Sequence, residues 1–200
     1  GGAIDDRQTT KLPALPRPTG LPARASGRAG ASGDVVLRAT DVVVDFGGVR
    51  AVDHASVEVR RHRIVGLIGP NGAGKTTLFN VMTGLQRPDS GHVLLGGIDV
   101  SKAATHKRAR LGLARTFQRL EVFGSLTVLD NVRAAAEIRH GRAGQLDMAE
   151  AALRRVGIEH LAGIPAHRLP TGQARLLELA RALVTQPRVL LLDEPASGLS

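Results

Sequence analysis

A glycine-rich stretch near the middle of the chain has the residue types and spacing of a phosphate-binding loop. Residues Gly69–Thr76 read Gly-Pro-Asn-Gly-Ala-Gly-Lys-Thr, which fits the pattern G-x-x-x-x-G-K-[ST]. Glycines allow backbone N–H groups to approach phosphate oxygens because no Cβ stands in the way. A helix that begins near Lys75 directs its unpaired N–H groups and the positive end of its dipole at the same anion. The stretch therefore predicts a site for the phosphates of a nucleotide.

The residues of this loop have separate predicted roles. Lys75 places a full positive charge at the β- and γ-phosphates, and the hydroxyl of Thr76 is a predicted Mg²⁺ ligand. The other predicted nucleotide-binding residues here are Gly69, Pro70, Asn71, Gly72, Ala73, Gly74 and Thr77. The alternative is a glycine-rich turn without a ligand. One of only four lysines falls on the required position, which favours the functional interpretation.

Two acids follow an apolar run near the end of the chain. Val189–Leu192 predicts a buried strand, and Asp193 and Glu194 come directly after it. Asp193 is placed to hold Mg²⁺, directly or through water, and Glu194 to polarise a water for attack on the γ-phosphate. The alternative is a strand end with two solvated acids. Together with the loop, the pair predicts a site that binds a nucleotide with Mg²⁺ and hydrolyses its β–γ phosphate bond.

The elements that must position these residues alternate between strands and helices, which is typical of an α/β architecture with a largely parallel core sheet. Strands are predicted at Val35–Leu37, Val42–Phe46, Ser56–Val59, Ile64–Ile68, His92–Leu95, Ile98–Val100 and Arg188–Leu192. Those before residue 60 are expected to form an antiparallel layer beside the core sheet. Ile64–Ile68 leads into the loop and is predicted to be a buried strand.

Helices are predicted at Lys75–Thr83, from Thr127 to about Ile138, at Leu146–Val156 and at Gln173–Val184. The second begins with a capping box in which Asp130 replaces the usual glutamate. The last has one apolar stripe, formed by Leu176, Leu179, Ala180 and Leu183.

Composition bounds the class of protein. The 200 residues are 42% hydrophobic and contain no cysteine, so a packed core is possible and disulfides are excluded. The sequence has no apolar run of about 18 residues, the length that spans a bilayer. Residues 1–33, rich in proline, glycine and arginine, predict a disordered linker or tail, and residues 34–200 the domain. The net charge of +9 is compatible with nucleic acid, an anionic membrane surface or a nucleotide.

From Asp34 to Ser200 the sequence resembles the ABC-type ATPases, the nucleotide-binding subunits of ABC transporters. It is especially similar to the branched-chain amino acid importer subgroup at Phe46–Val52, Gly66–Leu85, Ala114–Gln118 and Phe123–Val132. The resemblance implies a P-loop NTPase core with a parallel sheet, an N-terminal antiparallel β layer and a helical subdomain that carries a signature motif.

The resemblance also implies roles for residues outside the loop. Phe46 stands where the family has an aromatic residue that stacks on adenine, although a core position on a strand is an equal alternative. Gln118 stands at the Q-loop, where it senses the γ-phosphate and Mg²⁺ and contacts the membrane subunit. Leu169–Gln173 stands at the signature motif, which closes over ATP held by a second subunit. The nucleotide-binding residues implied there are Thr171, Gly172 and Gln173.

The partners implied are transmembrane permease subunits, a second ATPase subunit in a homo- or heterodimer and, indirectly, a solute-binding protein. The expected activity is ATP hydrolysis that drives import of branched-chain amino acids or similar small solutes. The expected location is the cytoplasmic face of the membrane, with the chain either peripheral or fused to a permease.

Two departures from the family pattern stand out. Pro170 occupies the position of the usual signature serine and lacks both a hydroxyl and an N–H group. The Thr171 hydroxyl, or the backbone N–H groups at Gly172, are expected to replace them. The switch histidine of the family is expected beyond Ser200, so the fold is expected to be incomplete at its C-terminus.

The basic stretch Lys102–Arg119 contains no acid and is interpreted either as a surface that meets a membrane subunit or as a solvated face. An alternative function is an ABC-type ATPase that acts on nucleic acid or ribosomes. The shortage of aromatic residues for base stacking disfavours it, and no nucleic acid is expected as a partner. A P-loop kinase ranks last because it has no place for the signature motif or for Gln118.

Overall fold

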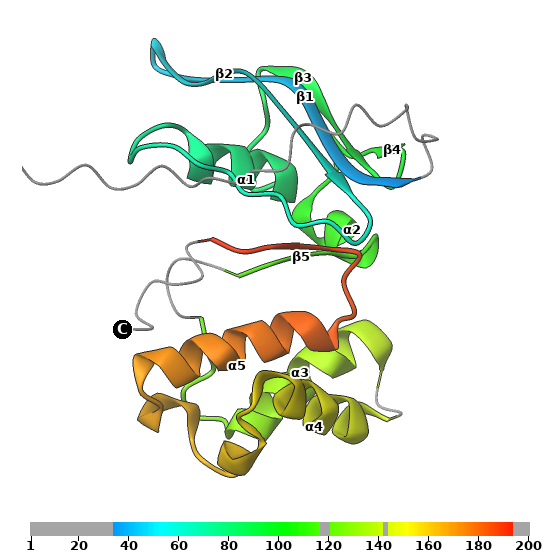
Figure 1. Ribbon diagram of the computed structural model, residues 1–200, viewed down its shortest axis with the longest axis vertical. Coiled ribbons are helices and arrows are strands. Elements are labelled where there is room, and N and C mark those ends of the chain that lie inside the picture. The colour runs from blue at the N-terminus through cyan, green and yellow to red at the C-terminus, as the bar shows by residue number, and fades with distance from the viewer. Residues whose placement is uncertain (1–33, 117–120, 142–143, 194–200) are drawn as a thin grey trace, which may run out of the picture. The chain divides into compact units, whose positions relative to one another are not determined.

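A computed structural model of the chain describes residues 34–116, 121–141 and 144–193. A four-stranded antiparallel sheet in the order β2-β1-β3-β4 forms one layer (Figure 1). Its strands are β1 (Val35–Phe46), β2 (Val49–Arg60), β3 (Ser90–Leu95) and β4 (Ile98–Asp99). The predicted antiparallel layer is therefore present. The predicted tail, 1–33, lies outside the described residues.

Strand β1 is one long strand where the sequence predicted two. Its pairing with β2 shifts register between Ala39 and Val42, and Asp41 has a φ of 54°. His54 on β2 also has a positive φ, and its Nδ1 lies 2.6 Å from Oδ1 of Asp41. Residues 38–41, which separate the two predicted strands, therefore form an irregularity inside one strand, as β-bulges do.

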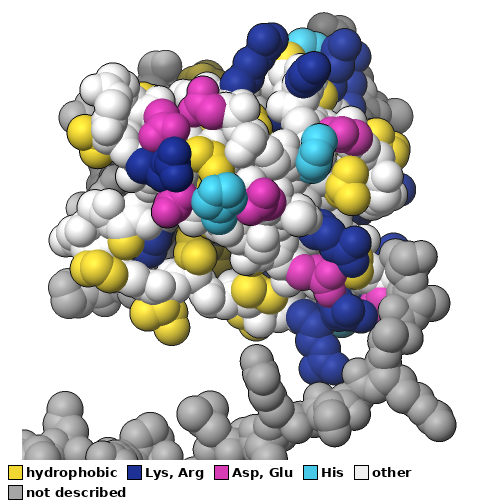
Figure 2. Space-filling model, turned by 90° about the horizontal axis from the view of Figure 1, so that it is seen from above, with side chains coloured by type: hydrophobic (Ala, Val, Ile, Leu, Met, Phe, Trp, Pro, Cys, Tyr) yellow, Lys and Arg dark blue, Asp and Glu magenta, His cyan; other side chains and the backbone are white. Residues whose placement is uncertain are grey.

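The antiparallel sheet exposes charges of both signs. Figure 2 shows acidic, basic and histidine side chains interspersed over the face seen from above. Arg38 on β1 and Glu58 on β2 are opposite each other in the register, and their charged groups lie 2.7 Å apart. The hydrogen bond from Arg38 lowers the pKa of the Glu58 carboxyl. This face therefore has no single sign of charge over the described strands.

Helix α1 (Lys75–Thr83), which follows the glycine-rich loop, packs against β1 and β2. Its bounds match the prediction. The first hydrophobic core joins this helix to the strands and includes Val44, Val81, Val93 and Leu113. The core thus holds the helix that carries Lys75 against the antiparallel layer.

The carboxyl end of α1 is held by a buried arginine from α2 (Thr105–Arg110). Arg108 is 1% exposed, and its guanidinium donates to the carbonyl oxygens of Val81 and Met82 at 2.6 and 2.8 Å. It also donates to two carbonyls in the connection between β4 and α2. Burial lowers the pKa of this guanidinium. The last carbonyls of a helix lack their usual partners within the helix, and Arg108 supplies a donor to them. The Val81 carbonyl also accepts from the N–H of Gly84 at 3.2 Å.

Two parallel strands form a second sheet, β5 (Leu113–Arg115) and β6 (Val189–Leu191). Leu113 pairs with Val189 and Arg115 with Leu191. The predicted strand at Arg188–Leu192 is present in slightly shorter form. In the described residues, the parallel part of the predicted core sheet consists of this pair.

The third layer is a helical subdomain made of α3 (Val128–His140), α4 (Gln145–Val156) and α5 (Thr171–Val184), which pack against one another. Two 3₁₀ turns, Glu159–Leu161 and Ala166–Arg168, connect α4 to α5. These three helices surround a second hydrophobic core. The predicted helices are all present, within a few residues of their expected bounds.

Half of the predicted capping box forms at α3. The hydroxyl oxygen of Thr127 accepts from the N–H of Asp130 at 3.1 Å, as predicted. The carboxylate of Asp130 accepts from the Thr127 hydroxyl at 2.6 Å, whereas a full capping box would direct it to a backbone N–H.

The predicted apolar stripe of α5 does not match the buried face. Ala180 is fully buried, but Leu176, Leu179 and Leu183 are only half-buried. The buried positions of this helix are Ala174, Leu177, Glu178, Ala180, Ala182 and Val184. Figure 1 shows α5 between the β5–β6 pair and the helices α3 and α4. Two sides of α5 therefore face other elements, whereas a single apolar stripe would bury only one side.

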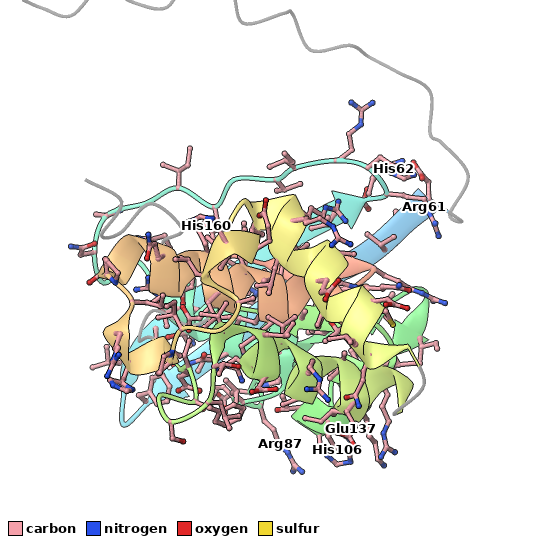
Figure 3. All side chains as sticks on the ribbon, turned by 90° about the horizontal axis from the view of Figure 1, so that it is seen from below. Arg61, His62, Arg87, His106, Glu137 and His160 are labelled. Carbon is pink, nitrogen blue, oxygen red and sulfur yellow. The ribbon has the colours of Figure 1, made fainter. Side chains whose placement is uncertain are left out.

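The prediction of a buried strand at Ile64–Ile68 is wrong. The segment has no strand conformation, and Ile64 and Ile68 are 102% and 95% exposed. It follows the turn at Arg61 and His62, which are labelled in Figure 3, and leads into the loop before α1. A buried strand needs hydrogen-bonded neighbours. In the described residues β5 and β6 pair only with each other, and the apolar run pairs with neither of them.

The contacts of Arg108 predict a large stability effect for a change that removes no apolar volume. We expect Arg108→Met to lower the free energy of unfolding by about 2–4 kcal/mol, because four carbonyls, two in α1 and two in the β4–α2 connection, each lose a charged donor. Urea denaturation followed by circular dichroism measures the change. Arg110→Met is the matched control, because Arg110 is exposed on the same helix; its effect should stay within about 0.5 kcal/mol. Equal effects of the two substitutions would contradict the assigned role.

Candidate nucleotide-binding site

The glycine-rich loop takes a backbone path that two of its glycines make possible. Gly72 and Gly74 have φ angles of 82° and 78°, in the left-handed region that favours glycine. A Cβ at Gly74 would also lie 2.1 Å from the carbonyl oxygen of Ala51 on β2. The loop therefore packs against β2 at a point where only glycine fits. This contact sets where α1 begins.

The side chain of Lys75 lies across the loop. Its Nζ donates to the carbonyl oxygens of Gly69 and Pro70, both at 2.6 Å. An ammonium group carries three donors, so these two contacts place the charge on the loop and still allow a further bond to a ligand. The N–H of Leu78 donates to the carbonyl of Gly74 at 2.8 Å, which starts the hydrogen-bond ladder of α1. The N–H groups that precede it in the first turn have no acceptor within the helix and can donate hydrogen bonds to an anion.

The exposed parts of the loop fit a phosphate ligand. Gly69–Ala73 are exposed and so is Thr76, whose hydroxyl stands in the first turn of α1. Thr77 is half-buried next to it. The residues predicted from the pattern are thus brought together at the N-terminus of α1. Lys75 supplies a charge there, Thr76 a hydroxyl, and Gly69–Ala73 an exposed stretch of backbone.

Asp193 is buried and forms an ion pair with an arginine that the sequence did not single out. Nη2 of Arg115 donates to Oδ2 of Asp193 at 2.8 Å, and the two side chains are 6% and 7% exposed. Nη1 of Arg115 donates to Oδ1 of Asn80 on α1 at 2.6 Å. Asn80 lies one helical turn after Thr76. The structure therefore connects Asp193, through Arg115, to the same helix that begins at the loop.

The basic stretch that contains Arg115 is not a uniform surface. Lys102, Lys107 and Arg110 are exposed, as either interpretation of the stretch requires. The side chains of Arg108 and Arg115 are buried, so both interpretations are wrong for these two residues. The only sequence signal for Arg115 was its place shortly before Gln118, and its neighbours of the same charge obscured it.

Phe46 is 50% exposed at the end of β1. This exposure rules out the alternative of a core phenylalanine. Phe46 pairs with Val49 across the turn between β1 and β2, and β2 meets the loop at Ala51. Its ring is therefore accessible on the hairpin that contacts the phosphate-binding loop.

The signature-motif residues stand at a different helix. Pro170 is the N-cap of α5, and the N–H of Ala174 donates to its carbonyl at 2.9 Å. Thr171 is exposed, and Gly172 and Gln173 are half-buried. Because α5 packs on α3 and α4, these residues belong to the helical subdomain, whereas Gly69–Thr77 belong to the layer of α1.

Two predicted site residues, Gln118 and Glu194, lie outside the described residues. Glu121, where the described residues resume, is held by α5. The Glu178 carboxylate accepts from the N–H of Glu121 at 2.8 Å, and Arg181 donates to the carbonyl of Glu121. The Arg181 guanidinium also lies 4.6 Å from the ring centroid of Phe123, and its burial lowers its pKa. Sequence reasoning missed these contacts.

The loop at the N-terminus of α1, between an antiparallel layer and a parallel pair of strands, defines a nucleotide-binding α/β domain of the P-loop class. Comparison with known proteins specifies the family. Residues 52–197 match the family model described as "ABC transporter". The chain belongs to this family and is an ATP-binding, ATP-hydrolysing subunit of the ABC type.

Similar proteins include named transport subunits. The high-affinity branched-chain amino acid transport ATP-binding protein LivG of Salmonella typhimurium is 38% identical over 181 residues, which cover 82% of this chain and 71% of that protein. BraF of Pseudomonas aeruginosa, a protein of the same description, is 35% identical with the same coverage. A probable ABC transporter ATP-binding protein of Azorhizobium caulinodans is 39% identical over 92% of this chain and 70% of its own length.

Solved structures agree with this assignment. An ATP-binding cassette of an ABC transporter in its ADP conformation superposes with a TM-score of 0.72 at 32% identity, covering 83% of this chain and 71% of that one. A nucleotide-free cassette gives a TM-score of 0.69 at 33% identity, covering 80% and 69%. The fold class and the resemblance predicted from sequence are confirmed. Within the described residues, no helix has the length and apolar character needed to cross a bilayer.

The contact between Gly74 and Ala51 predicts different effects for two similar substitutions. Gly74→Ala should abolish nucleotide binding and destabilise the domain, because the new Cβ would overlap the Ala51 carbonyl. Gly72→Ala is the matched control, since Gly72 has the same kind of φ but open space around its Cβ position. We expect it to cost about 1–2 kcal/mol of stability, from the left-handed backbone alone. Thermal unfolding with and without ATP measures both. Similar behaviour of the two variants would show that the close approach does not matter.

Proposed function

We propose that the chain binds Mg·ATP at the Gly69–Thr77 loop and hydrolyses it to drive import of branched-chain amino acids or similar small solutes. The observation that carries the site is the position of Lys75, whose ammonium lies on the loop carbonyls at the N-terminus of α1. The solute class is supported by LivG and BraF, whose printed descriptions name branched-chain amino acid transport. We further propose that residues 34–200 form the ATP-binding domain.

The residues present fit a magnesium ion. Mg²⁺ is usually held by one or two protein oxygens together with substrate phosphates and water. Thr76 presents a hydroxyl at the start of α1, and Asp193 is held beside the same helix through Arg115 and Asn80. We assign Thr76, Asp193 and Gln118 to this ion, which when bound would neutralise charge on the β- and γ-phosphates.

The protein groups share the remaining work of catalysis. Lys75 holds a positive charge against the β- and γ-phosphates, where negative charge develops during transfer. Glu194 is proposed to orient the attacking water and accept its proton. Gln118 is proposed to report the state of the γ-phosphate to the membrane subunit. The loop amides and Lys75 are held in place before the reaction, which is the main contribution that a protein makes to phosphoryl transfer.

A second ATPase subunit and a permease complete the proposed working unit. Thr171, Gly172 and Gln173 begin α5 and are proposed to close over nucleotide held by the other subunit. Phe46, exposed on the β1–β2 hairpin, is proposed to stack on adenine. The permease subunits place the chain at the cytoplasmic face of the membrane, and a solute-binding protein acts indirectly through them. Membership of the ABC transporter family supports a permease partner.

The alternative of an ATPase acting on nucleic acid or ribosomes is not favoured. The similar proteins named above are transport subunits. Two arginines of the basic stretch are also buried in the fold, and the antiparallel sheet displays charges of both signs. The basic charge of the chain therefore does not concentrate there in the way that a nucleic-acid surface requires.

Removal of the loop lysine tests the proposed site. We expect Lys75→Met to weaken Mg·ATP binding about 100-fold, because a charge-assisted contact of up to about 3 kcal/mol is lost. Isothermal calorimetry with a slowly hydrolysed ATP analogue measures the affinity. Lys102→Met removes the same charge at an exposed position outside the loop and should leave the affinity unchanged. If both variants bind as the unmodified chain does, the loop does not hold the nucleotide.

Pro170 provides a separate test of the proposed contact between two subunits. A serine at this N-cap can accept from an N–H of the first turn of α5 and should stabilise the helix by about 1 kcal/mol. Because Thr171 and the N-terminal N–H groups remain available in the unmodified chain, we expect Pro170→Ser to change ATP hydrolysis less than about threefold. The measurement is hydrolysis rate against protein concentration. A large gain would show that the native motif is impaired.

A further inference from the structure

The Arg115 guanidinium occupies the point where three elements meet. Arg115 ends β5, Asp193 follows β6, and Asn80 stands on α1. The distances are 2.8 Å from Nη2 to Asp193 Oδ2 and 2.6 Å from Nη1 to Asn80 Oδ1. The guanidinium carbon also lies 5.7 Å from the ring centroid of Phe79. The planar Arg115 guanidinium therefore contacts both the Asp193 carboxylate and the helix that begins at the phosphate-binding loop.

Because it is buried, the ion pair between Arg115 and Asp193 orients the carboxylate more than it stabilises the fold. An ion pair that loses its water gains little net stability, because the cost of removing both charges from solvent offsets their attraction. The side chains of Arg115 and Asp193 are both less than a tenth exposed. The guanidinium is rigid and planar, so its two nitrogens hold their partners in fixed directions. The observed arrangement fixes the Asp193 carboxylate relative to Asn80.

Asn80, which accepts a hydrogen bond from Arg115, lies on the face of α1 that also carries Thr76 of the loop. Asn80 and Thr76 are four residues apart on α1 and lie on the same face of the helix. Helix side chains lean toward the N-terminus, which brings the Asn80 amide toward Thr76. Arg115 pairs with Leu191 in parallel register, so Arg115 and Asp193 both leave their strands at the carboxyl end. In open α/β sheets, ligands bind at this end of the strands.

We propose that Arg115 is a positioning residue for Asp193: it sets the orientation of the carboxylate and, through Asn80, holds it at the face of α1 that carries Thr76. The inference rests on the proposed function, which assigns Thr76 and Asp193 to a divalent cation. Arg115 donates to Oδ2 of Asp193. We assign the other carboxylate oxygen, Oδ1, to the metal or to a water bound to it. Arg115 itself touches neither nucleotide nor metal in this scheme.

The test separates metal affinity from nucleotide affinity. The variants are Arg115→Met, Arg115→Lys and Asn80→Ala, and the nucleotide is a slowly hydrolysed ATP analogue. Electron paramagnetic resonance of free Mn²⁺ measures the affinity of the chain–nucleotide complex for the metal, and nucleotide binding is measured separately in EDTA. We expect Arg115→Met to weaken Mn²⁺ binding about tenfold with less than a twofold change in EDTA. Arg115→Lys and Asn80→Ala should each weaken Mn²⁺ binding about threefold.

The control is Arg133→Met, which breaks an ion pair with Asp130 on α3, where the two groups lie 3.1 Å apart. It should leave Mn²⁺ affinity unchanged. Mn²⁺ affinity equal to that of the unmodified chain in the folded Arg115 and Asn80 variants would overturn the inference and leave the proposed function standing. If Arg115→Met does not fold, Arg115→Lys and Asn80→Ala decide by the same criterion. Failure of the unmodified chain to bind the nucleotide would instead overturn the proposed function, and this inference with it.

Discussion

The close approach of Gly74 to the Ala51 carbonyl is the constraint on which the nucleotide-binding site depends. It fixes the start of α1 against β2, because no side chain fits between the two backbones. Lys75 then follows at the first helical position, with its ammonium on the loop carbonyls. The unpaired N–H groups of the first turn have a direction set by the helix axis. The proposed phosphate site is therefore formed by the backbone of the folded chain, and the lysine adds charge to it.

Two buried arginines extend this constraint along the same helix. Arg108 donates to carbonyls at the carboxyl end of α1, and Arg115 reaches its middle through Asn80. Both lie in a stretch whose composition is typical of a solvated basic surface. A guanidinium has five donors in a planar array, so it can satisfy several carbonyl or amide oxygens in a site where a lysine could not. The position of α1 is thus determined at its start, at its side and at its end.

The helical subdomain has its own core and its own connection to the site. Helix α5 begins at the signature-motif residues and, further along, holds both the N–H and the carbonyl of Glu121 through Glu178 and Arg181. Glu121 lies three residues after Gln118. The helix that starts at the signature-motif residues therefore fixes Glu121, where the described residues resume.

The sequence by itself determined the loop, its lysine, four of the helices (α1, α3, α4 and α5) and the antiparallel layer, because each depends on neighbouring residues: glycine spacing, hydrophobic period and turn residues. It did not predict α2. It also indicated Asp193 through a strand followed by acids. Only the tertiary structure decided the partner of Asp193, since Arg115 is 78 residues away in the chain and stands in a basic stretch in which Lys102, Lys107 and Arg110 are exposed. The same holds for Ile64–Ile68. An apolar run can be read from sequence, but its burial depends on whether another strand lies beside it, and that is a property of the folded chain.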